Sequence, residues 1–402
     1  MRVVVDGKAM QDAHGFMAKL RASAPVCPAS EARQAAAVLV TRYEDVRALV
    51  GDGRVRHDVR SKAEQEAAAE QRELTPREEL MHRALGISMI YRDPPDHTRL
   101  RRLVNRAFTP RAVERLRPPL STVIDELIAA FTPGRPVDLV AEFAVPLTTF
   151  AICELLGIPQ DERAAFWGWS QEINDAELGD GYYEALAEAV AYLTALIERK
   201  RANPGTDLLS ELIAVSDEDG DRLSADELVA TSLLLLIAGH DTSVHLIANA
   251  VLCLLTSPDQ LAALRADPSL VDNVVEEVLR YESPVNILPP RFAGSAIELA
   301  GGTIPEGEMV LLSVLSANRD ESVFPDPDRF DITRSTAGHL AFGHGIHYCP
   351  GAPLARMEGR LAIAALVARF PHLRLAVPPA EVRWRDSTLM HGLESLPVRT
   401  GS

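Results

Sequence analysis

The residues best suited to chemistry surround one cysteine near the C-terminus. The segment Phe342 to Gly351 reads FGHGIHYCPG, with Gly343 and Gly345 before Cys349 and Gly351 after it. Glycine adopts positive φ and lets the backbone approach a ligand closely. A predicted helix begins just after this cysteine, and the N–H groups of a helix N-terminus favour a thiolate. One cysteine cannot hold zinc, but one thiolate can be the single axial protein ligand of haem iron.

The other three cysteines lack such a context. Cys27, Cys153 and Cys253 lie in apolar or turn segments, and no C-x-x-C pair occurs. Neither a zinc site nor a compact disulfide framework is therefore indicated. We expect these three to be buried structural thiols.

A second chemical group lies within a long apolar run. The capping-box pattern Ser224-x-x-Glu227 predicts a helix from Ala225 to about Ser257. A helix that is apolar all round must cross the centre of the molecule. Near its middle, Asp241 and Thr242 place an acid beside a hydroxyl, which provides a path for protons. The alternative is a kink in which the threonine bonds back to a carbonyl.

The same helix carries a glycine and two histidines near this pair. Gly239 costs about 1 kcal/mol relative to alanine in a helix interior. We expect it, with Ala238, to leave room for a flat ligand and a diatomic molecule against the backbone. His240 and His245 are five residues apart and do not share a helix face. We interpret them as structural or substrate-side residues rather than metal ligands.

Together these motifs resemble the cytochrome P450 haem–thiolate monooxygenases, in their soluble bacterial form. The resemblance extends from about Met10 to Val398 and is closest to the actinobacterial macrolide- and polyketide-hydroxylating group. It implies a mainly α fold with minor β, built as a single domain over residues 1–402. Haem b would lie between the long helix and the cysteine loop, and residues 165–200 would form lid helices.

The resemblance also implies roles for individual residues. Cys349 would ligate iron, and Asp241 and Thr242 would deliver protons for oxygen activation. The residues expected to bind the haem, the first four through its carboxylates, are His97, Arg101, Arg291, His347, Phe342, Gly343, Gly351, Ala238 and Gly239. The sequence departs from the closest group at two positions: Asp241 stands where glutamate is more common, and Pro350 where leucine is. Neither departure threatens haem binding.

A glutamate–arginine pair is expected to support the cysteine loop. Glu277-x-x-Arg280 places opposite charges on one helix face. The same pattern occurs at Glu44/Arg47, Glu114/Arg117 and Glu198/Arg201, so the spacing alone decides nothing. The resemblance singles out the pair at 277 and 280, and it implies a structural triad with Arg329 as its third member.

Substrate contacts are expected from four mostly apolar segments. The residues predicted to line the pocket are Ile87, Ile90, Leu234, Ala238, Asn286, Ile287, Leu288 and Met390. An apolar pocket suits a lipophilic substrate with few polar anchors.

Composition and charge exclude several classes of protein. The chain has 402 residues, 47% hydrophobic and 24% charged, which are globular values. Its formal net charge of −16 argues against nonspecific binding to nucleic acid or to an anionic membrane. The N-terminus does not resemble a signal peptide, and the apolar stretch from Leu228 to Ala238 is too short to span a bilayer. We expect a cytoplasmic monomer.

One basic segment stands out in this acidic chain. Residues 92–117 contain eight arginines and three acids. No G-x-G-x-x-G fingerprint of a reductase occurs. We therefore predict that a ferredoxin, with its ferredoxin reductase and NAD(P)H, supplies electrons, and that it docks on this arginine segment.

The predicted function is insertion of one oxygen atom from O2 into a lipophilic natural product, by hydroxylation or epoxidation. A macrolide, polyketide or terpenoid is the expected substrate. A peroxide-driven or oxidative-coupling enzyme is an alternative, as is a non-catalytic haem sensor or ligand carrier. The Asp241–Thr242 pair speaks against peroxide dependence and against a sensor, because neither needs a proton relay. A non-haem hydrolase is disfavoured because no G-x-S-x-G motif occurs.

Overall fold

The computed structural model describes residues 3–31, 36–58, 73–175, 179–218 and 223–401. The chain forms two compact units. Unit 1 comprises residues 1–56, 121–147 and 242–402, and unit 2 comprises residues 57–120 and 148–241. The expectation of one large domain stays a prediction. Residues 61–80 are rich in charged side chains and alanine, and part of this segment lies outside the described residues.

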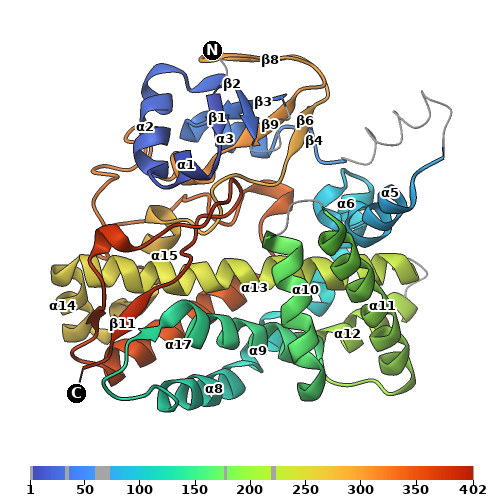
Figure 1. Cartoon of the computed structure of the whole chain (residues 1–402). Coiled ribbons are helices and arrows are strands. Elements are labelled where there is room, and N and C mark those ends of the chain that lie inside the picture. The colour runs from blue at the N-terminus through green and yellow to red at the C-terminus, as the bar shows by residue number, and fades with distance from the viewer. Residues whose placement is uncertain (1–2, 32–35, 59–72, 176–178, 219–222, 402) are drawn as a thin grey trace. The chain divides into compact units, whose positions relative to one another are not determined.

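The largest sheet of unit 1 has six strands in the order β1-β2-β3-β9-β6-β4 (Figure 1). These strands are β1 (Val3–Val5), β2 (Val26–Glu31), β3 (Ala36–Val40), β4 (Val55–Arg56), β6 (Arg291–Ala293) and β9 (Met309–Leu312). Smaller sheets pair β7 (Ile297–Leu299) with β8 (Gly302–Ile304), and β11 (Pro397–Arg399) with β10 (Arg374–Leu375) and β5 (Val137–Asp138).

Both faces of the six-stranded sheet are buried where β3 runs parallel to β9. In this register Leu39 pairs with Leu311 and Val40 with Leu312. Because side chains alternate between the faces of a strand, the first pair packs in one core cluster and the second pair in another. This explains why residues 36–40 form a continuous apolar run rather than an alternating one.

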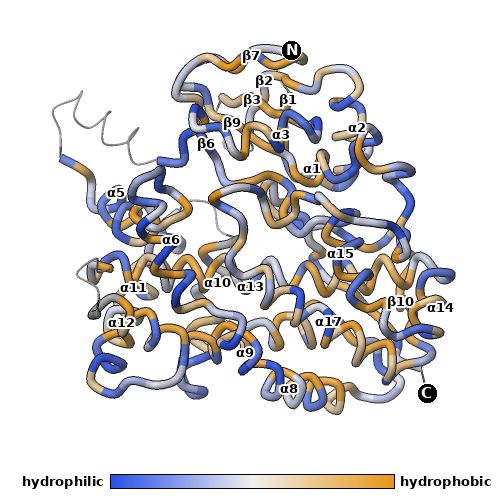
Figure 2. The backbone as a smooth tube through the Cα atoms, turned by 180° about the vertical axis from the view of Figure 1, so that it is seen from behind, coloured by the Kyte–Doolittle hydropathy of each residue, from blue (hydrophilic) through white to orange (hydrophobic). Residues whose placement is uncertain are grey.

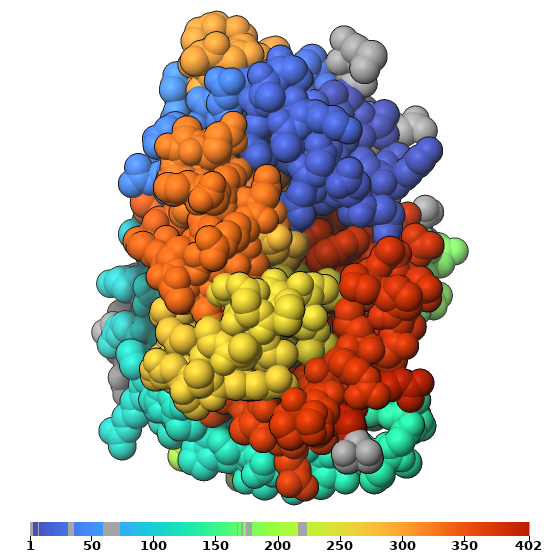
Figure 3. Space-filling model, turned by 90° about the vertical axis from the view of Figure 1, so that its left-hand side faces the viewer, coloured from blue at the N-terminus to red at the C-terminus, as the bar shows by residue number. Residues whose placement is uncertain are grey.

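Some helices of unit 1 pack on this sheet, and others build a separate apolar core. The helices of this unit are α1 (Gly7–Met10), α2 (Ala13–Ser23), α3 (Tyr43–Val50), most of α8 (Arg117–Ala129), α14 (Pro258–Ala266), α15 (Val271–Tyr281), α16 (Val314–Ala317) and α17 (Ala352–Arg369). Residues from α13, α14, α15 and α17 form one hydrophobic cluster. Figure 3 shows how chain segments far apart in sequence lie side by side in this unit: the N-terminal segment (blue), the helices near residue 270 (yellow) and the C-terminal segment (red).

The described residues of unit 2 form helices and loops, without a strand. Its helices are α5 (Pro76–Met81), α6 (Asp96–Ala107), α7 (Pro110–Glu114), most of α9 (Val145–Leu156), α10 (Arg163–Asp175), α11 (Asp180–Ala202) and α12 (Leu208–Glu218). Helices α10 and α11 cover the region predicted to form the lid, and they pack on each other. Tyr182 and Tyr183 of α11 meet edge to face, with ring centroids 5.3 Å apart.

Helix α13 (Ala225–Thr256) contributes residues to both units. Its predicted capping box is present: the Glu227 carboxylate accepts from the Ser224 N–H at 2.8 Å, and the Glu227 N–H donates to the Ser224 hydroxyl at 3.1 Å. By length and composition α13 is apolar enough to cross a membrane, contrary to the estimate from its shorter apolar stretch. However, 78% of its most apolar window is buried within the protein, as in the core helix of a soluble fold. Figure 2 shows the hydrophobic residues of this helix in orange.

The apolar run Met309–Leu315 has a pattern that predicts one strand over its whole length. It forms β9 only as far as Leu312, and α16 follows. Ser313 ends the strand because its hydroxyl accepts from the N–H of Ser316 at 3.1 Å and so caps the short helix.

Candidate active site

The cysteine loop of unit 1 is held in place by its own backbone. The N–H of Cys349 donates to the carbonyl of Phe342 at 2.9 Å, and the N–H of Gly343 donates to the carbonyl of Leu340 at 2.8 Å. Gly343 and Gly345 have φ of 72° and 69°, a backbone conformation that residues other than glycine rarely adopt. Helix α17 begins three residues after Cys349, so the thiol precedes a helix N-terminus as predicted.

An arginine of α17 fixes the two aromatic residues of this loop. The Arg356 guanidinium lies over the Phe342 ring at 4.6 Å and reaches the Tyr348 hydroxyl at 3.3 Å. The same guanidinium pairs with Glu276 of α15 at 2.5 Å, and His339 contacts this carboxylate at 3.0 Å. Burial would raise the pKa of Glu276, but these hydrogen bonds outweigh it and lower that pKa to about 2.

The predicted Glu277–Arg280 pair is confirmed and is completely buried. Two parallel bonds of 2.8 Å join the guanidinium to the carboxylate, and both side chains are 0% exposed. Arg280 also donates to the carbonyl of Asn318 at 3.1 Å. The Asn318 side chain in turn accepts from the N–H of Leu340 at 2.7 Å, at the start of the cysteine loop. The buried pair is thus connected to the loop through one asparagine.

The prediction that Arg329 completes this triad is wrong. The Arg329 side chain is 63% exposed and only approaches Asp331 at 3.8 Å. Instead, Arg334 forms the second ion pair with Glu277, at 3.2 Å, and is 12% exposed. Arg329, five residues before Arg334, contributes its backbone instead of its side chain. Its carbonyl accepts hydrogen bonds from Arg280 and from Arg334.

The remaining cysteines are buried, as predicted. Burial raises the pKa of Cys153 to about 12 and also raises the pKa values of Cys27 and Cys253. A thiol with a raised pKa is a poor nucleophile and a poor metal ligand. Cys349 is the one half-buried cysteine among the four.

The donors expected for the haem carboxylates occur in both units, and each set fits that role by itself. In unit 1, Arg291 is buried on β6, and His347 ends a short turn two residues before Cys349. In unit 2, His97 and Arg101 lie four residues apart on α6, and His97 is buried. Burial first, and then the nearby Arg101 cation, lower the pKa of His97 to about 4. A neutral imidazole beside a guanidinium is a donor pair that suits a carboxylate.

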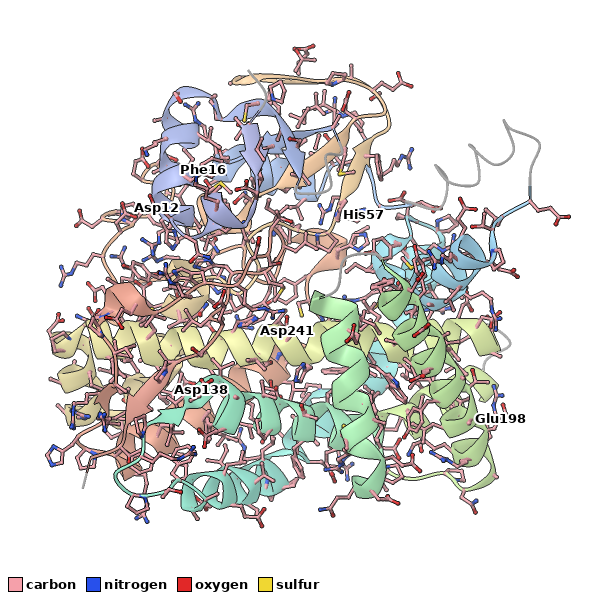
Figure 4. All side chains as sticks on the ribbon, in the orientation of Figure 1. Asp12, Phe16, His57, Asp138, Glu198 and Asp241 are labelled. Carbon is pink, nitrogen blue, oxygen red and sulfur yellow. The ribbon has the colours of Figure 1, made fainter. Side chains whose placement is uncertain are left out.

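The middle of α13 presents small residues among buried ones. Ala238 is exposed and Gly239 and Thr242 are partly exposed, whereas residues 228–236 and 243–250 are buried. Ala238 and Thr242 are four residues apart and share a helix face. Asp241 is buried, and Figure 4 labels it on this helix. A Cβ at Gly239 would lie 3.1 Å from Ile152 of α9, so this glycine also permits close packing.

His245 of α13 has a structural environment. Its Nε2 lies 2.9 Å from the Arg385 guanidinium, and its ring packs on the backbone of Gly392. His240 is buried on the same helix. The contacts of His245 are those of a structural residue, and the role of His240 stays a prediction.

Two further histidines of unit 1 converge on one carboxylate. The Nε2 atoms of His14 and His391 each lie 2.7 Å from the same oxygen of Glu282. Arg319 binds the other oxygen at 3.1 Å and lies 3.2 Å from the His14 ring. Since a guanidinium already neutralises Glu282, this cluster ties α2 to the C-terminal segment by hydrogen bonds.

Several predicted substrate contacts belong to the core of unit 1. The Asn286 amide is fully buried and bonds to the Thr388 carbonyl at 3.0 Å and the Ser313 hydroxyl at 3.2 Å, which argues against contact with substrate. Ile287 and Leu288 lie in two hydrophobic core clusters. Ile87, Ile90 and Met390 are half-buried, Ala238 is exposed and Leu234 is buried. Their contact with substrate stays a prediction.

The arginine segment of unit 2 is less basic at its surface than its composition indicates. Four of its arginines pair with acids: Arg92 with Asp58, Arg99 with Glu227, Arg115 with Glu211 and Arg117 with Glu114. Arg102 and Arg106 of α6 and Arg111 of α7 are exposed. Figure 4 labels His57, whose ring lies 3.4 Å from Asp93 near the start of this segment.

Sequence reasoning missed three residues of this region: Arg334, Arg356 and Glu358. Arg356 and Glu358 follow the cysteine by seven and nine residues, on α17. The position of Arg356 on the helix that follows the cysteine loop could have indicated its role. No sequence signal indicates the burial of Glu358.

Comparisons with known proteins agree with this geometry. A family model described as Cytochrome P450 matches residues 172–391. "6-deoxyerythronolide B hydroxylase" of Saccharopolyspora erythraea is 45% identical and is aligned over 95% of this chain and 94% of its own. "Vitamin D(3) 25-hydroxylase" of Pseudonocardia autotrophica is 47% identical over 98% of this chain and 95% of its own. The tirandamycin C-bound P450 monooxygenase TamI superposes with a TM-score of 0.90 at 41% identity, covering 99% of this chain and all of that one.

Proposed function

Since the chain belongs to the cytochrome P450 family and is a haem b monooxygenase, we propose that it oxidises a lipophilic natural product of the macrolide, polyketide or terpenoid kind. The reaction inserts one oxygen atom from O2, as a hydroxylation or an epoxidation. Haem b supplies the activation of O2 and accepts NAD(P)H-derived electrons delivered by redox partners.

The observation that carries this proposal is the cysteine loop. Cys349 is half-buried, follows Gly343 and Gly345 of positive φ, and lies three residues before α17, whereas the other cysteines have raised pKa values. This environment favours a thiolate at Cys349. Cys349 is the proposed iron ligand, and the donors Arg291, His347, His97 and Arg101 are the proposed partners of the haem carboxylates.

The names of the relatives support the substrate class. Proteins similar to this chain are called 6-deoxyerythronolide B hydroxylase, Mycinamicin IV hydroxylase/epoxidase and Vitamin D(3) 25-hydroxylase. Each of these names is that of a hydroxylase, and one is also that of an epoxidase. The half-buried apolar side chains of Ile87, Ile90 and Met390 suit a lipophilic substrate.

The first experiment tests the iron ligand. The purified protein is reduced and exposed to CO, and its absorption is recorded together with that of Cys349→Ala. Thiolate ligation gives a far red-shifted Soret band in the wild type and its loss in the variant. A spectrum typical of histidine ligation, or an unchanged spectrum in the variant, would contradict this assignment. Cys27→Ala is the matched control because that cysteine is buried in β2, outside the cysteine loop.

Asp241 and Thr242 are the proposed proton relay. Asp241 is buried and can pass a proton to the neighbouring, more exposed Thr242 hydroxyl. Thr242→Ala should keep haem and substrate binding but release reduced oxygen as peroxide. NAD(P)H consumption, peroxide and product are measured together, and full coupling in the variant would show that protons arrive by another route.

The proposed electron donor is a ferredoxin, served by its ferredoxin reductase. Arg102, Arg106 and Arg111 form an exposed cationic surface on an acidic chain, and an acidic donor would be steered to it. We also propose a monomer in the cytoplasm. A screen of polyketides and terpenoids for a substrate-induced spin shift would identify the substrate.

A further inference from the structure

Three side chains of unit 1 that commonly bind metals meet at one point, although they are far apart in the sequence. The Nε2 atoms of His14 on α2 and of His391 in the C-terminal segment each lie 2.7 Å from the same oxygen, Oε2 of Glu282. The three ligand atoms all lie within 4.8 Å of one another. Glu282 is 268 residues from His14 and 109 residues from His391, so no local spacing in the sequence predicts this group.

Two of these three residues are held firmly by their neighbours. Asn249 of α13 donates to the backbone carbonyls of both Glu282 and His391, at 3.1 and 3.0 Å. The Trp384 ring stacks on the His391 ring, with centroids 3.9 Å apart and 15° between the planes. The side chains of Glu282 and His391 are 10% and 3% exposed. Ligands that are already in place lose little conformational freedom when an ion binds.

His14 is the residue through which solvent reaches the group. It lies in the first turn of α2, and its side chain is 25% exposed. A tetrahedral zinc ion keeps its nitrogen and oxygen ligands about 3.3 Å apart, given bonds of about 2.0–2.1 Å. The rings and the carboxylate oxygen must therefore separate by about 0.6 Å, which is within the range of ordinary side-chain motion.

The contacts of the His14 ring conflict when only protons are available. Its Nε2 faces the Glu282 oxygen at 2.7 Å and a guanidinium nitrogen of Arg319 at 3.2 Å. With a proton, Nε2 donates to Glu282 but meets a second donor in Arg319. Without a proton, it accepts from Arg319 but faces an acceptor in Glu282. A metal ion bound by both the Nε2 lone pair and the carboxylate oxygen removes this second conflict.

The charges around the group favour a cation. Arg319 donates to the other oxygen of Glu282, Oε1, at 3.1 Å and to Asp328 at 2.9 Å, so two carboxylates share one guanidinium. With both rings neutral, the group carries one more negative than positive charge, which attracts a cation. The Arg319 bond also leaves Oε2 available and orients the carboxylate, as the hydrogen-bond partner of a metal-bound carboxylate commonly does.

We propose that His14, Glu282 and His391 form a binding site for one zinc ion, with water as the fourth ligand. Two imidazoles and one carboxylate with an open fourth position are a ligand set that zinc takes in proteins. Mg²⁺ and Ca²⁺ prefer oxygen ligands and should bind poorly here. The ion would replace the hydrogen bonds to Oε2 in tying α2 to the C-terminal segment. The site uses none of the residues proposed to bind haem or to deliver protons, so it stands independently of the proposed function.

Calorimetric titration with ZnCl2 tests the site on untagged, haem-loaded protein that has been treated with a chelator and exchanged into buffer. The wild type should bind one zinc ion, and His14→Gln and His391→Gln should each bind it at least about 100-fold more weakly. A glutamine amide can still donate to Glu282, so these variants should fold and keep the wild-type haem spectrum, but they lack the imidazole lone pair. MgCl2 should give no comparable binding.

The matched control is His372→Ala, which removes an exposed histidine elsewhere in unit 1. It should bind zinc as the wild type does. The proposal is overturned if the wild type binds no zinc, if both glutamine variants bind it as tightly as the wild type, or if His372→Ala loses the same affinity.

X-ray absorption at the zinc K edge identifies the ligands, because haem iron absorbs at a different energy. The zinc-loaded wild type should show nitrogen and oxygen ligands at about 2.0–2.2 Å, with the outer-shell scattering of two imidazole rings. A ligand at about 2.3 Å would be sulfur, would place the ion on a cysteine and would overturn the proposal.

Discussion

The same glutamate–arginine spacing occurs on α15 and beside α7, with very different surroundings. Glu277 and Arg280 are 0% exposed, and the guanidinium also donates to three backbone carbonyls. Glu114 and Arg117 form an equally short pair of 2.8 Å, but their side chains are 58% and 42% exposed. Distance therefore does not distinguish the two pairs, and burial decides what each contributes.

The difference extends to the regions around the pairs. Around α15, charges lie inside the protein and connect to the cysteine loop through Asn318 and Arg356. Around α6 and α7, arginines pair with acids at the surface or remain exposed. We expect substitutions in the first region to change stability and haem binding, and those in the second to change encounters with a partner.

The largest expected effect is that of Arg280→Ala. Removing one partner of a buried pair leaves an uncompensated charge and costs about 3–5 kcal/mol. Arg117→Ala should cost less than about 1 kcal/mol. Denaturant unfolding and the ratio of haem to protein absorbance measure both variants. Equal losses would break the comparison.

A smaller effect should separate Arg334 from Arg329. Arg334→Ala removes an ion pair to Glu277 and bonds to the carbonyls of Pro325 and Asp326, and should cost roughly 2–3 kcal/mol. Arg329→Ala removes an exposed side chain and should cost less than about 0.5 kcal/mol. The same unfolding measurement applies. A reversed order would restore Arg329 as the third member of the triad.

Glu276 should make the stability of the α15 region depend on acid pH. Its pKa is lowered to about 2 in the folded protein from an ordinary value of 4.5. Its contribution is therefore complete above pH 4.5 and is lost as the pH falls toward 2. Glu276→Gln should be less stable than wild type by roughly 1–2 kcal/mol at pH 7, since solvent screens part of the interaction.

The measurement for Glu276 is unfolding at a series of pH values. The difference between wild type and Glu276→Gln should shrink progressively below pH 4.5. Glu114→Gln, on the exposed pair, is the matched control and should show little difference at any pH. A constant difference for Glu276→Gln would contradict the lowered pKa.

The smallest effect on stability, but a clear one on rate, is expected on α6. Arg102→Glu combined with Arg106→Glu should leave unfolding nearly unchanged and slow the first electron transfer from a ferredoxin about tenfold at low salt. The effect should fade with salt, because the Debye length is about 8 Å at physiological ionic strength.

The control for charge reversal is Arg201→Glu with Arg369→Glu. These exposed arginines lie on α11 and α17, and the net charge changes equally. If both double variants show the same rate and salt slope, the donor docks elsewhere. Reduction by dithionite should be normal in both.

The sequence predicted elements with strong local signals. The capping box at Ser224 and Glu227 predicted the start of α13, and the glycines of the cysteine loop predicted positive φ at Gly343 and Gly345. It failed where a contact joins distant residues through the backbone: Arg329 contributes a carbonyl, and Arg334 contributes the charge. Asn286 also misled, because a polar residue in an apolar turn can bind backbone instead of substrate.

Burial explains the other omissions. Glu358 and Glu114 are both helical glutamates, and only the three-dimensional packing shows that the first is buried and the second exposed. The ion pairs of Arg99 and Arg115 use acids more than 90 residues away in the chain. For that reason the local count of charges in residues 92–117 overstated the exposed basic surface.

The parallel pairing of β3 with β9 has a consequence for synthesis on the ribosome. Residues 36–40 find their partner only when residues 309–312 have been made. At about 5–20 residues per second, this takes roughly 15–55 s. During that time β3 has one unpaired, strongly apolar edge, of the kind that associates with other chains. A nascent chain arrested before residue 309 would therefore be a client for chaperones.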